Sequence, residues 1–248
     1  MLAAGVDVLN ENEDIGLEGE AVEAVKFLLE KGADPHAVNN NGENAMHGAI
    51  GYRGWLQVAR LLREKKVREG FAQLAPLGLS FDAWVYHPQL GDVIDLARAF
   101  PGTQIVLNHV GGPIGLGRYK GKRDEVFADW SGRIRELAAC PNVHVKLGGL
   151  GMKMFGFDVH EGEIAPGSEQ LAGLWRPYVE TCIDAFGTKR AMFESNFPVD
   201  KIACAYVPLW NSFKKMAARY SGSERDALLR ETAARVYRLD LPALLARA

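Results

Sequence analysis

The feature that most constrains the fold is an alternation of short apolar runs with amphipathic segments between residues 79 and 237. Four runs have the composition of buried strands: LSFDAWVYH (79–87), QIVLNHV (104–110), VHVKLGGL (143–150) and RAMFESNFP (190–198). Strands that alternate with helices form βα units with parallel strands, and near-continuous apolar runs are typical of strands that helices cover. The sequence therefore predicts an α/β fold with a sheet of about four parallel strands. The predicted helices have apolar faces at Val93, Leu96, Ala97 and Phe100; at Phe127, Trp130, Ile134 and Leu137; at Val179, Cys182, Ile183 and Phe186; and at Leu229, Thr232, Ala233 and Val236.

Polar residues or glycines close each predicted strand at its carboxyl end. They are His87, Asn108 with His109, Gly148 with Gly149, and Ser195 with Asn196. The carboxyl ends of parallel strands lie at one edge of a sheet, and βα folds bind their ligands at that edge. The sequence therefore predicts a ligand site there.

Residues 1–66 have a different pattern. Two helical stripes flank a polar turn at 39–42, and the motif NAMHGA (44–49) resembles the ankyrin signature T-P-L-H-x-A. The resemblance implies ankyrin-like helices with at most about two repeats, in which His47 is structural. It also implies a surface that binds a protein partner.

The motifs FDAWVYHPQL, IVLNHVGGP, VHVKLGGLG and MFESNFPVDK resemble consecutive strand ends of the amidohydrolase-related family. This family comprises TIM-barrel hydrolases and decarboxylases, and it includes lactonases. The resemblance implies two domains, an ankyrin-like segment at 1–66 and strands five to eight of a partial TIM barrel at 67–248. It also implies a hydrolase in which water attacks a lactone or similar carbonyl of a small carboxylate or sugar substrate.

Two departures from the family pattern affect metal binding. The family's opening His-x-His pair is absent from the chain, and Asn196 stands where many relatives have an Asp that binds metal and takes a proton from water. An amide cannot serve as a carboxylate base or anionic ligand. His87 and His109 alone are fewer than the three or four ligands of a stable zinc site. We therefore predict no metal ligands and no firmly bound cofactor, although zinc occurs in the family. Asp200 could replace the missing carboxylate, but its place four residues after Asn196 favours a loop or helix cap.

The strand ends supply five candidate site residues. We expect His109 to be catalytic because imidazole titrates near neutrality and can deprotonate water. We expect Asn196 to be catalytic by orienting a water or a carbonyl. His87, Asn108 and Lys146 are expected to bind substrate. Lys146 is costly to bury unpaired, so it reaches either a substrate carboxylate or an internal acid.

Composition excludes several other classes of protein. The 248 residues carry a net charge of -2, so no basic field recruits nucleic acid or anionic lipid. No apolar run approaches the roughly 20 residues of a membrane span, and no signal peptide is visible. Three widely spaced cysteines favour neither a disulfide framework nor a zinc knuckle. We expect a cytoplasmic protein with a small-molecule substrate and with no nucleic-acid or membrane partner.

Four strands are half of a barrel, which leaves more than one reading of the whole chain. A second copy would complete the barrel in a homo-oligomer, or the ankyrin-like helices would cover its open side. The alternative is a non-catalytic interaction module built on a barrel remnant. The change of pattern at 64–67 has no Gly/Ser-rich or Pro-rich linker, so a recombination or assembly junction also fits.

Overall fold

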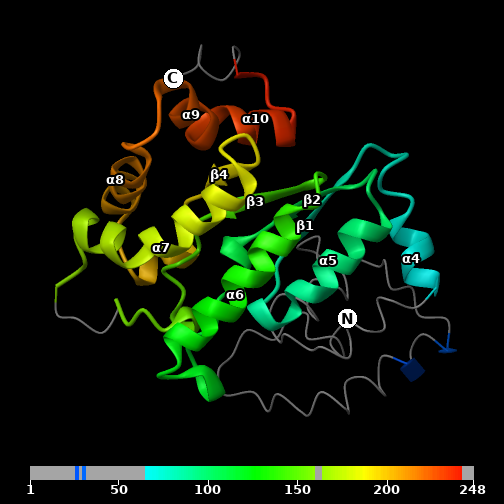
Figure 1. The fold of residues 1–248 in the computed structure, drawn as a ribbon, viewed down its shortest axis with the longest axis horizontal. Helices are drawn as coiled ribbons and strands as arrows, with labels where there is room; N and C mark the ends of the chain where they lie inside the picture. The colour runs from blue at the N-terminus through cyan, green and yellow to red at the C-terminus, as the bar shows by residue number, and fades with distance from the viewer. Residues whose placement is uncertain (1–25, 28–29, 32–64, 160–163, 242–248) are drawn as a thin grey trace. The chain divides into compact units, whose positions relative to one another are not determined.

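The structure is a computed structural model that describes residues 26–27, 30–31, 65–159 and 164–241 (Figure 1). The chain consists of two compact units, Met1–Leu79 and Ser80–Ala248. In the first unit, helix α4 (Lys65–Phe71) is followed by hydrogen-bonded turns as far as Leu79. The ankyrin-like arrangement predicted for residues 1–66 lies outside the described residues, except for 26–27, 30–31 and 65–66.

The second unit contains the predicted parallel sheet. Its strands are β1 (Ser80–Ala83), β2 (Gln104–Leu107), β3 (Val143–Leu147) and β4 (Ala191–Phe193). They lie in the order β1-β2-β3-β4, and each pairs in parallel with the next. This confirms the predicted α/β class and the parallel sheet of four strands.

Each strand ends several residues before its predicted end, because the backbone turns where the polar residues begin. Short 3-10 helices start at His87 and at His109. His109, Val110 and Asn196 have the positive φ angles 52°, 49° and 49°, which are incompatible with a continuing strand. The polar residues are therefore carried by tight turns that leave the sheet.

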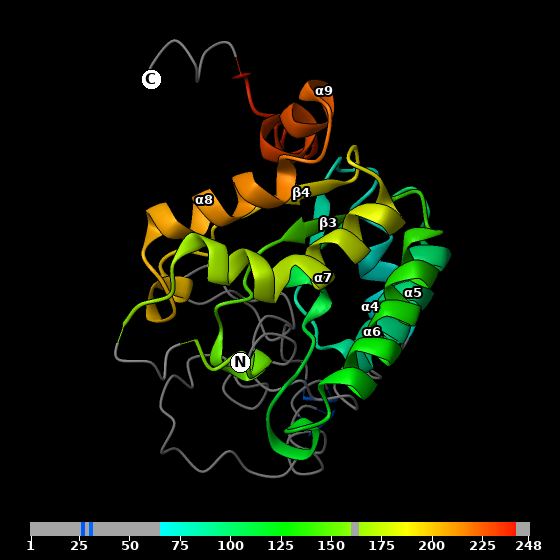
Figure 2. The same cartoon turned by 60° about the vertical axis from the view of Figure 1, so that its left-hand side comes forward.

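The two faces of the sheet differ, because successive strand residues point to opposite sides. One face is entirely apolar and buried at Ala83, Ile105, Leu107, Val143, Val145, Leu147, Ala191 and Phe193. Four helices accompany the sheet: α5 (Leu90–Ala99), α6 (Arg123–Ala138), α7 (Ser168–Phe186) and α8 (Tyr206–Ala217). They lie side by side in this order along the sheet (Figures 1 and 2). The other face, which is more polar, carries Asp82, Val106, His144, Lys146 and Met192.

The C-terminal helices partly cover the polar face. The elements are α9 (Gly222–Asp226), a π-helical turn (Ala227–Glu231) and α10 (Thr232–Tyr237). Val236 of α10 packs against Val106 and Met192, and the side-chain amide of Gln104 donates to the carbonyl of Val236. Helix α10 is thus anchored to the middle of this face, and the strand ends lie beyond it. Within the described residues, no helix has the length and apolarity needed to cross a membrane.

Candidate functional site

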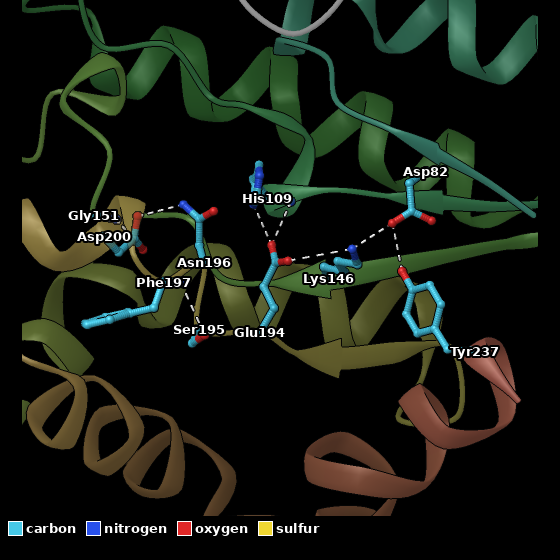
Figure 3. Close-up of polar contacts among 10 residues, drawn as sticks. All are labelled: Asp82, His109, Lys146, Gly151, Glu194, Ser195, Asn196, Phe197, Asp200 and Tyr237. Atoms are coloured by element: carbon cyan, nitrogen blue, oxygen red, sulfur yellow. Dashed lines mark hydrogen bonds and ion pairs between the residues drawn. The ribbon is translucent and has the colours of Figure 1, made fainter. Parts of the chain in front are cut away.

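The candidate site lies at the carboxyl ends of β2, β3 and β4, and His109 and Glu194 form its centre (Figure 3). One carboxylate oxygen of Glu194 lies 2.6 Å from Nδ1 of His109 and accepts a 3.2 Å hydrogen bond from the His109 backbone N–H. The two side chains are only 14% and 16% exposed. The ring of Trp84 also packs edge-on to the imidazole, with centroids 4.7 Å apart. These contacts fix the ring and leave Nε2 as the nitrogen available to a ligand.

The turn that carries His109 is held in an unfavourable backbone conformation. Left-handed angles at His109 and at the β-branched Val110 cost on the order of 1–3 kcal/mol each. The surrounding structure offsets this cost, because the buried indole of Trp130 donates a 2.7 Å hydrogen bond to the carbonyl of the fully buried Val110. Such strain is concentrated at functional sites, where it holds a side chain ready for its ligand.

Three glycines after β3 make room for the polar side chains of the site. A Cβ on Gly148 would lie 2.2 Å from the carbonyl oxygen of Glu194, and one on Gly149 would lie 2.5 Å from Nδ1 of His109. A Cβ on Gly151 would lie 2.9 Å from Cγ of Asp200. Gly149 also has a φ of +71°, which disfavours other residues. The small residues of the GGLG sequence therefore allow Glu194, His109 and Asp200 to lie in direct contact with this segment.

Lys146 connects the His109–Glu194 pair to Asp82 on the edge strand β1. Its ammonium lies 2.7 Å from Oδ2 of Asp82 and 3.9 Å from Oε2 of Glu194. The hydroxyl of Tyr237, on α10, donates to the same oxygen of Asp82 at 2.8 Å. Burial alone would lower the pKa of Lys146, but Glu194 and Asp82 raise it above the ordinary lysine value. Of the two roles expected for Lys146, the structure shows contact with internal acids.

Asn196 pairs with Asp200 beside the centre of the site. The Asn196 amide nitrogen donates a 2.8 Å hydrogen bond to Oδ1 of Asp200, and the Gly151 N–H donates to Oδ2 at 3.2 Å. Asp200 is fully buried. Burial raises the pKa of Asp200 to about 6, and the two hydrogen bonds act against that shift. Asp200, in the short 3-10 helix Val199–Ile202, is thus a buried partner of Asn196.

The other two predicted site residues make different contacts. His87 is buried, its Nδ1 accepts a hydrogen bond from the backbone N–H of Ile114, and its ring stacks edge-on to Tyr119. Burial lowers the pKa of His87 to about 4, so its ring is neutral at pH 7. The amide oxygen of Asn108 is buried and has no hydrogen-bond partner among the described residues. The structure therefore brings His109, Asn196 and Lys146 together around Glu194, and a role in substrate binding for His87 and Asn108 stays a prediction.

Comparison with known families identifies the chain. The profile of the family described as Amidohydrolase matches residues 45–239, which is most of the sequence. The chain belongs to the amidohydrolase family. The profile of ankyrin repeats matches residues 17–63 and overlaps the first match. The domain boundary predicted between residues 66 and 67 stays a prediction.

Two curated relatives of this amidohydrolase cover most of the chain. An uncharacterized protein, y4mH, of Sinorhizobium fredii is 40% identical over 190 residues, which are 76% of this chain and 57% of the relative. An L-fucono-1,5-lactonase of Burkholderia multivorans is 33% identical over 202 residues, which are 78% of this chain and 64% of the lactonase. The chain thus spans less than two thirds of the length of both.

Solved structures of amidohydrolases agree with the fold. A crystal structure of an amidohydrolase from Burkholderia multivorans with bound HEPES has a TM-score of 0.63 at 30% identity. The matched residues are 74% of this chain and 61% of that chain. Another crystal form with bound zinc has a TM-score of 0.62 at 26% identity and covers 90% and 80%. The four βα units are therefore part of a TIM-barrel fold.

Zinc does not fit the residues described in this amidohydrolase. Among them, no group of three or more His, Cys, Asp or Glu side chains is arranged to hold a metal ion. Nδ1 of His109 is engaged by Glu194, and the Asn196 amide turns its nitrogen to Asp200. Nε2 of His109 and the side-chain oxygen of Asn196 stay open, but two donors are fewer than the three or four ligands of a stable zinc site. No step of the proposed hydrolysis therefore depends on a metal.

Sequence reasoning did not select Glu194, although its signal was present. In the run RAMFESNFP, the period of two places Met192 and Glu194 on one side of the strand. A carboxylate that follows a buried strand on the ligand-facing side needs a partner, and the neighbouring strand end offers His109. Asp82 and Tyr237 carried no comparable signal, because the Asp82–Lys146 contact depends on strand register and the Asp82–Tyr237 contact depends on the position of α10.

Proposed function

We propose that this amidohydrolase is a hydrolase that opens a lactone or a similar cyclic ester, with His109 as the general base. The hydrogen-bonded pair of His109 and Glu194 is the observation that carries this proposal. The relationship to an L-fucono-1,5-lactonase supports the lactone class. Because the chain spans only part of its relatives, the substrate and the activity itself are part of the proposal.

The geometry assigns a direction to proton transfer. The carboxylate of Glu194 accepts the Nδ1 proton of His109, so the lone pair of the neutral ring lies on Nε2. A water near Nε2 gives up a proton to that nitrogen as its oxygen attacks the carbonyl of the lactone. The imidazolium that forms is stabilised by Glu194, as a carboxylate stabilises histidine in hydrolytic triads. The proton on Nε2 is then available to the departing alkoxide.

Hydrolysis of a panel of sugar lactones, followed by acid release, tests this proposal. We expect His109→Ala to lower turnover by about 10²- to 10⁴-fold, the usual contribution of a general base. Glu194→Gln should cause a large loss as well, because a glutamine amide can donate to Nδ1 and hold the wrong tautomer. His144→Asn is the matched control, since His144 lies near the start of β3 and the charged groups that act on its pKa are Arg235 and Arg190. A panel that the parent chain does not turn over, or a fully active His109→Ala variant, would overturn the proposal.

The ankyrin match at residues 17–63 favours a second function, the binding of a protein partner. This function does not need the strand-end residues. A purified partner should therefore bind the His109→Ala variant as tightly as the parent chain, and changes in the polar cluster 39–42 should weaken binding. Equal binding by variants of that cluster would contradict a role for the ankyrin-like segment.

A further inference from the structure

Asp200 is a buried carboxylate that the proposed reaction does not use. Both of its oxygens have fixed partners, the Asn196 side chain and the Gly151 backbone N–H. Burial raises the pKa of Asp200 to about 6, so the group is ionised at pH 8. An ionised carboxylate can only accept hydrogen bonds. Asn196 must therefore present its NH₂ group to Asp200 and turn its carbonyl oxygen the other way.

The outward oxygen of Asn196 is available to a ligand. Asn196 is partly buried, and the structure gives its side-chain oxygen, Oδ1, no hydrogen-bond partner among the described residues. In Figure 3 this oxygen points away from Asp200, on the side of Asn196 that faces His109. His109 and Glu194 are close enough to influence the pKa of Asp200 electrostatically, which places this pair beside the reactive centre.

We propose that Asp200 is a positioning residue that holds Asn196 as a hydrogen-bond acceptor, so that the site selects a ligand hydroxyl or amino group over a ketone or carboxylate at the contacted position. A hydroxyl or amine can donate to the amide oxygen, whereas a ketone or carboxylate presents only lone pairs to it. The inference rests on the proposed function, because the ligand is the substrate of the same site.

Asp200→Asn tests the orientation of the Asn196 amide, because the Gly151 N–H fixes which way the new amide at position 200 must point. The new amide at position 200 has only one oxygen, and the backbone donor of Gly151 needs it. Its NH₂ group then faces Asn196, which must turn its own oxygen inward and its nitrogen toward the ligand. Asp200→Asn changes few atoms, yet it should reverse the polarity that Asn196 presents.

The orientation is measured without any turnover. In the parent chain, the side-chain NH₂ resonances of Asn196 should shift with a midpoint near pH 6, as Asp200 ionises. The titratable groups that face Asp200 are His109, Glu194 and Cys204. Asp200→Asn removes the shift if Asp200 causes it. A shift that persists in this variant, or resonances that do not move between pH 5 and 8, would overturn the assignment.

Selectivity is measured with sugar δ-lactams, which resist hydrolysis and bind whether or not the chain is catalytic. Each lactam of the set has one hydroxyl replaced by a ketone. At one ring position the replacement should weaken binding at pH 8 by about tenfold or more in the parent chain, and by much less in Asp200→Asn. The selectivity ratio is the dissociation constant of the ketone lactam divided by that of the hydroxyl lactam. Asp226→Asn, on the exposed surface of α9, is the matched control and should have the same ratio as the parent chain.

A second measurement keeps the proposal testable if Asp200→Asn does not fold. At pH 5 Asp200 is protonated and can donate to Asn196, so the parent chain itself should lose the selectivity seen at pH 8. Equal ratios at both pH values, or an unchanged ratio in Asp200→Asn, would overturn the proposal. Lactam binding without lactone turnover would reject the proposed hydrolysis and leave the role of Asp200 standing.

Discussion

Replacing Lys146 with methionine tests the charged contacts that hold Glu194. The ammonium lies 2.7 Å from Asp82 and 3.9 Å from Glu194, which at an effective dielectric constant near 20 gives gross attractions of roughly 6 and 4 kcal/mol. Loss of hydration cancels most of this attraction. Removing one partner of a fully buried ion pair costs about 3–5 kcal/mol, because a buried charge is left uncompensated. Asp82 is 34% exposed, so we expect Lys146→Met to lower the free energy of unfolding by about 2–3 kcal/mol.

The assay is urea unfolding at pH 7 and at pH 9. The folded-state pKa of Lys146 is raised above its unfolded value, so its contribution is fully present below the unfolded pKa, about 10.4, and is lost only as pH rises through the folded value. The cost of the substitution should therefore be the same at both pH values. Lys214→Met, at an exposed position of α8, is the matched control and should change stability by less than about 0.5 kcal/mol. A Lys146→Met cost no larger than that of the control, or one that vanishes by pH 9, would refute the reasoning.

Three further outcomes are expected. Trp130→Phe removes the donor to the buried carbonyl of Val110 and should lower unfolding free energy in urea by about 1–3 kcal/mol, and an unchanged midpoint would contradict that role. Gly149→Ala places a Cβ 2.5 Å from His109 and should abolish lactone turnover, whereas Gly173→Ala, whose Cβ meets nothing within 4 Å, should leave turnover intact; equal activity of the two variants would count against the packing argument. If a second copy completes the barrel, light scattering during size exclusion should give twice the mass of one chain, and a monomer at micromolar concentration would exclude that arrangement.

Much of the fold followed from local sequence patterns. Burial between the sheet and its helices requires nearly continuous apolar strands and helices with one apolar face. The predicted strands and helices on this side of the sheet agree with the structure. Helix α8 was not among the predicted helices, although its buried face includes Leu209, Phe213 and Met216. Strand ends were predicted too late, because the turns begin at His109 and Asn196, where the backbone adopts angles that residue type does not reveal.

The candidate site was predictable by region and less so by residue. His109, Asn196 and Lys146 meet at the expected edge because parallel strands align their carboxyl ends. The partners of these residues required tertiary information. Lys146 on β3 reaches Asp82 on β1 across the intervening β2, and Asp200 meets the Gly151 N–H from 49 residues away in sequence. Contacts of this kind depend on strand register and on loop paths, which one sequence does not specify.

The glycines after β3 fix the spacing of the candidate site by the side-chain atoms that they lack. Each glycine sets how closely His109, Glu194 or Asp200, which follow other strands, can approach it, so a larger residue would displace that group without changing its chemistry. Relatives with the same chemistry should thus be recognised by the spacing Gly-Gly-x-Gly together with their polar residues. Engineering that aims at bulkier substrates should leave this segment unchanged and vary the loop at 116–122, where Leu116, Arg118 and Lys120 are exposed to solvent.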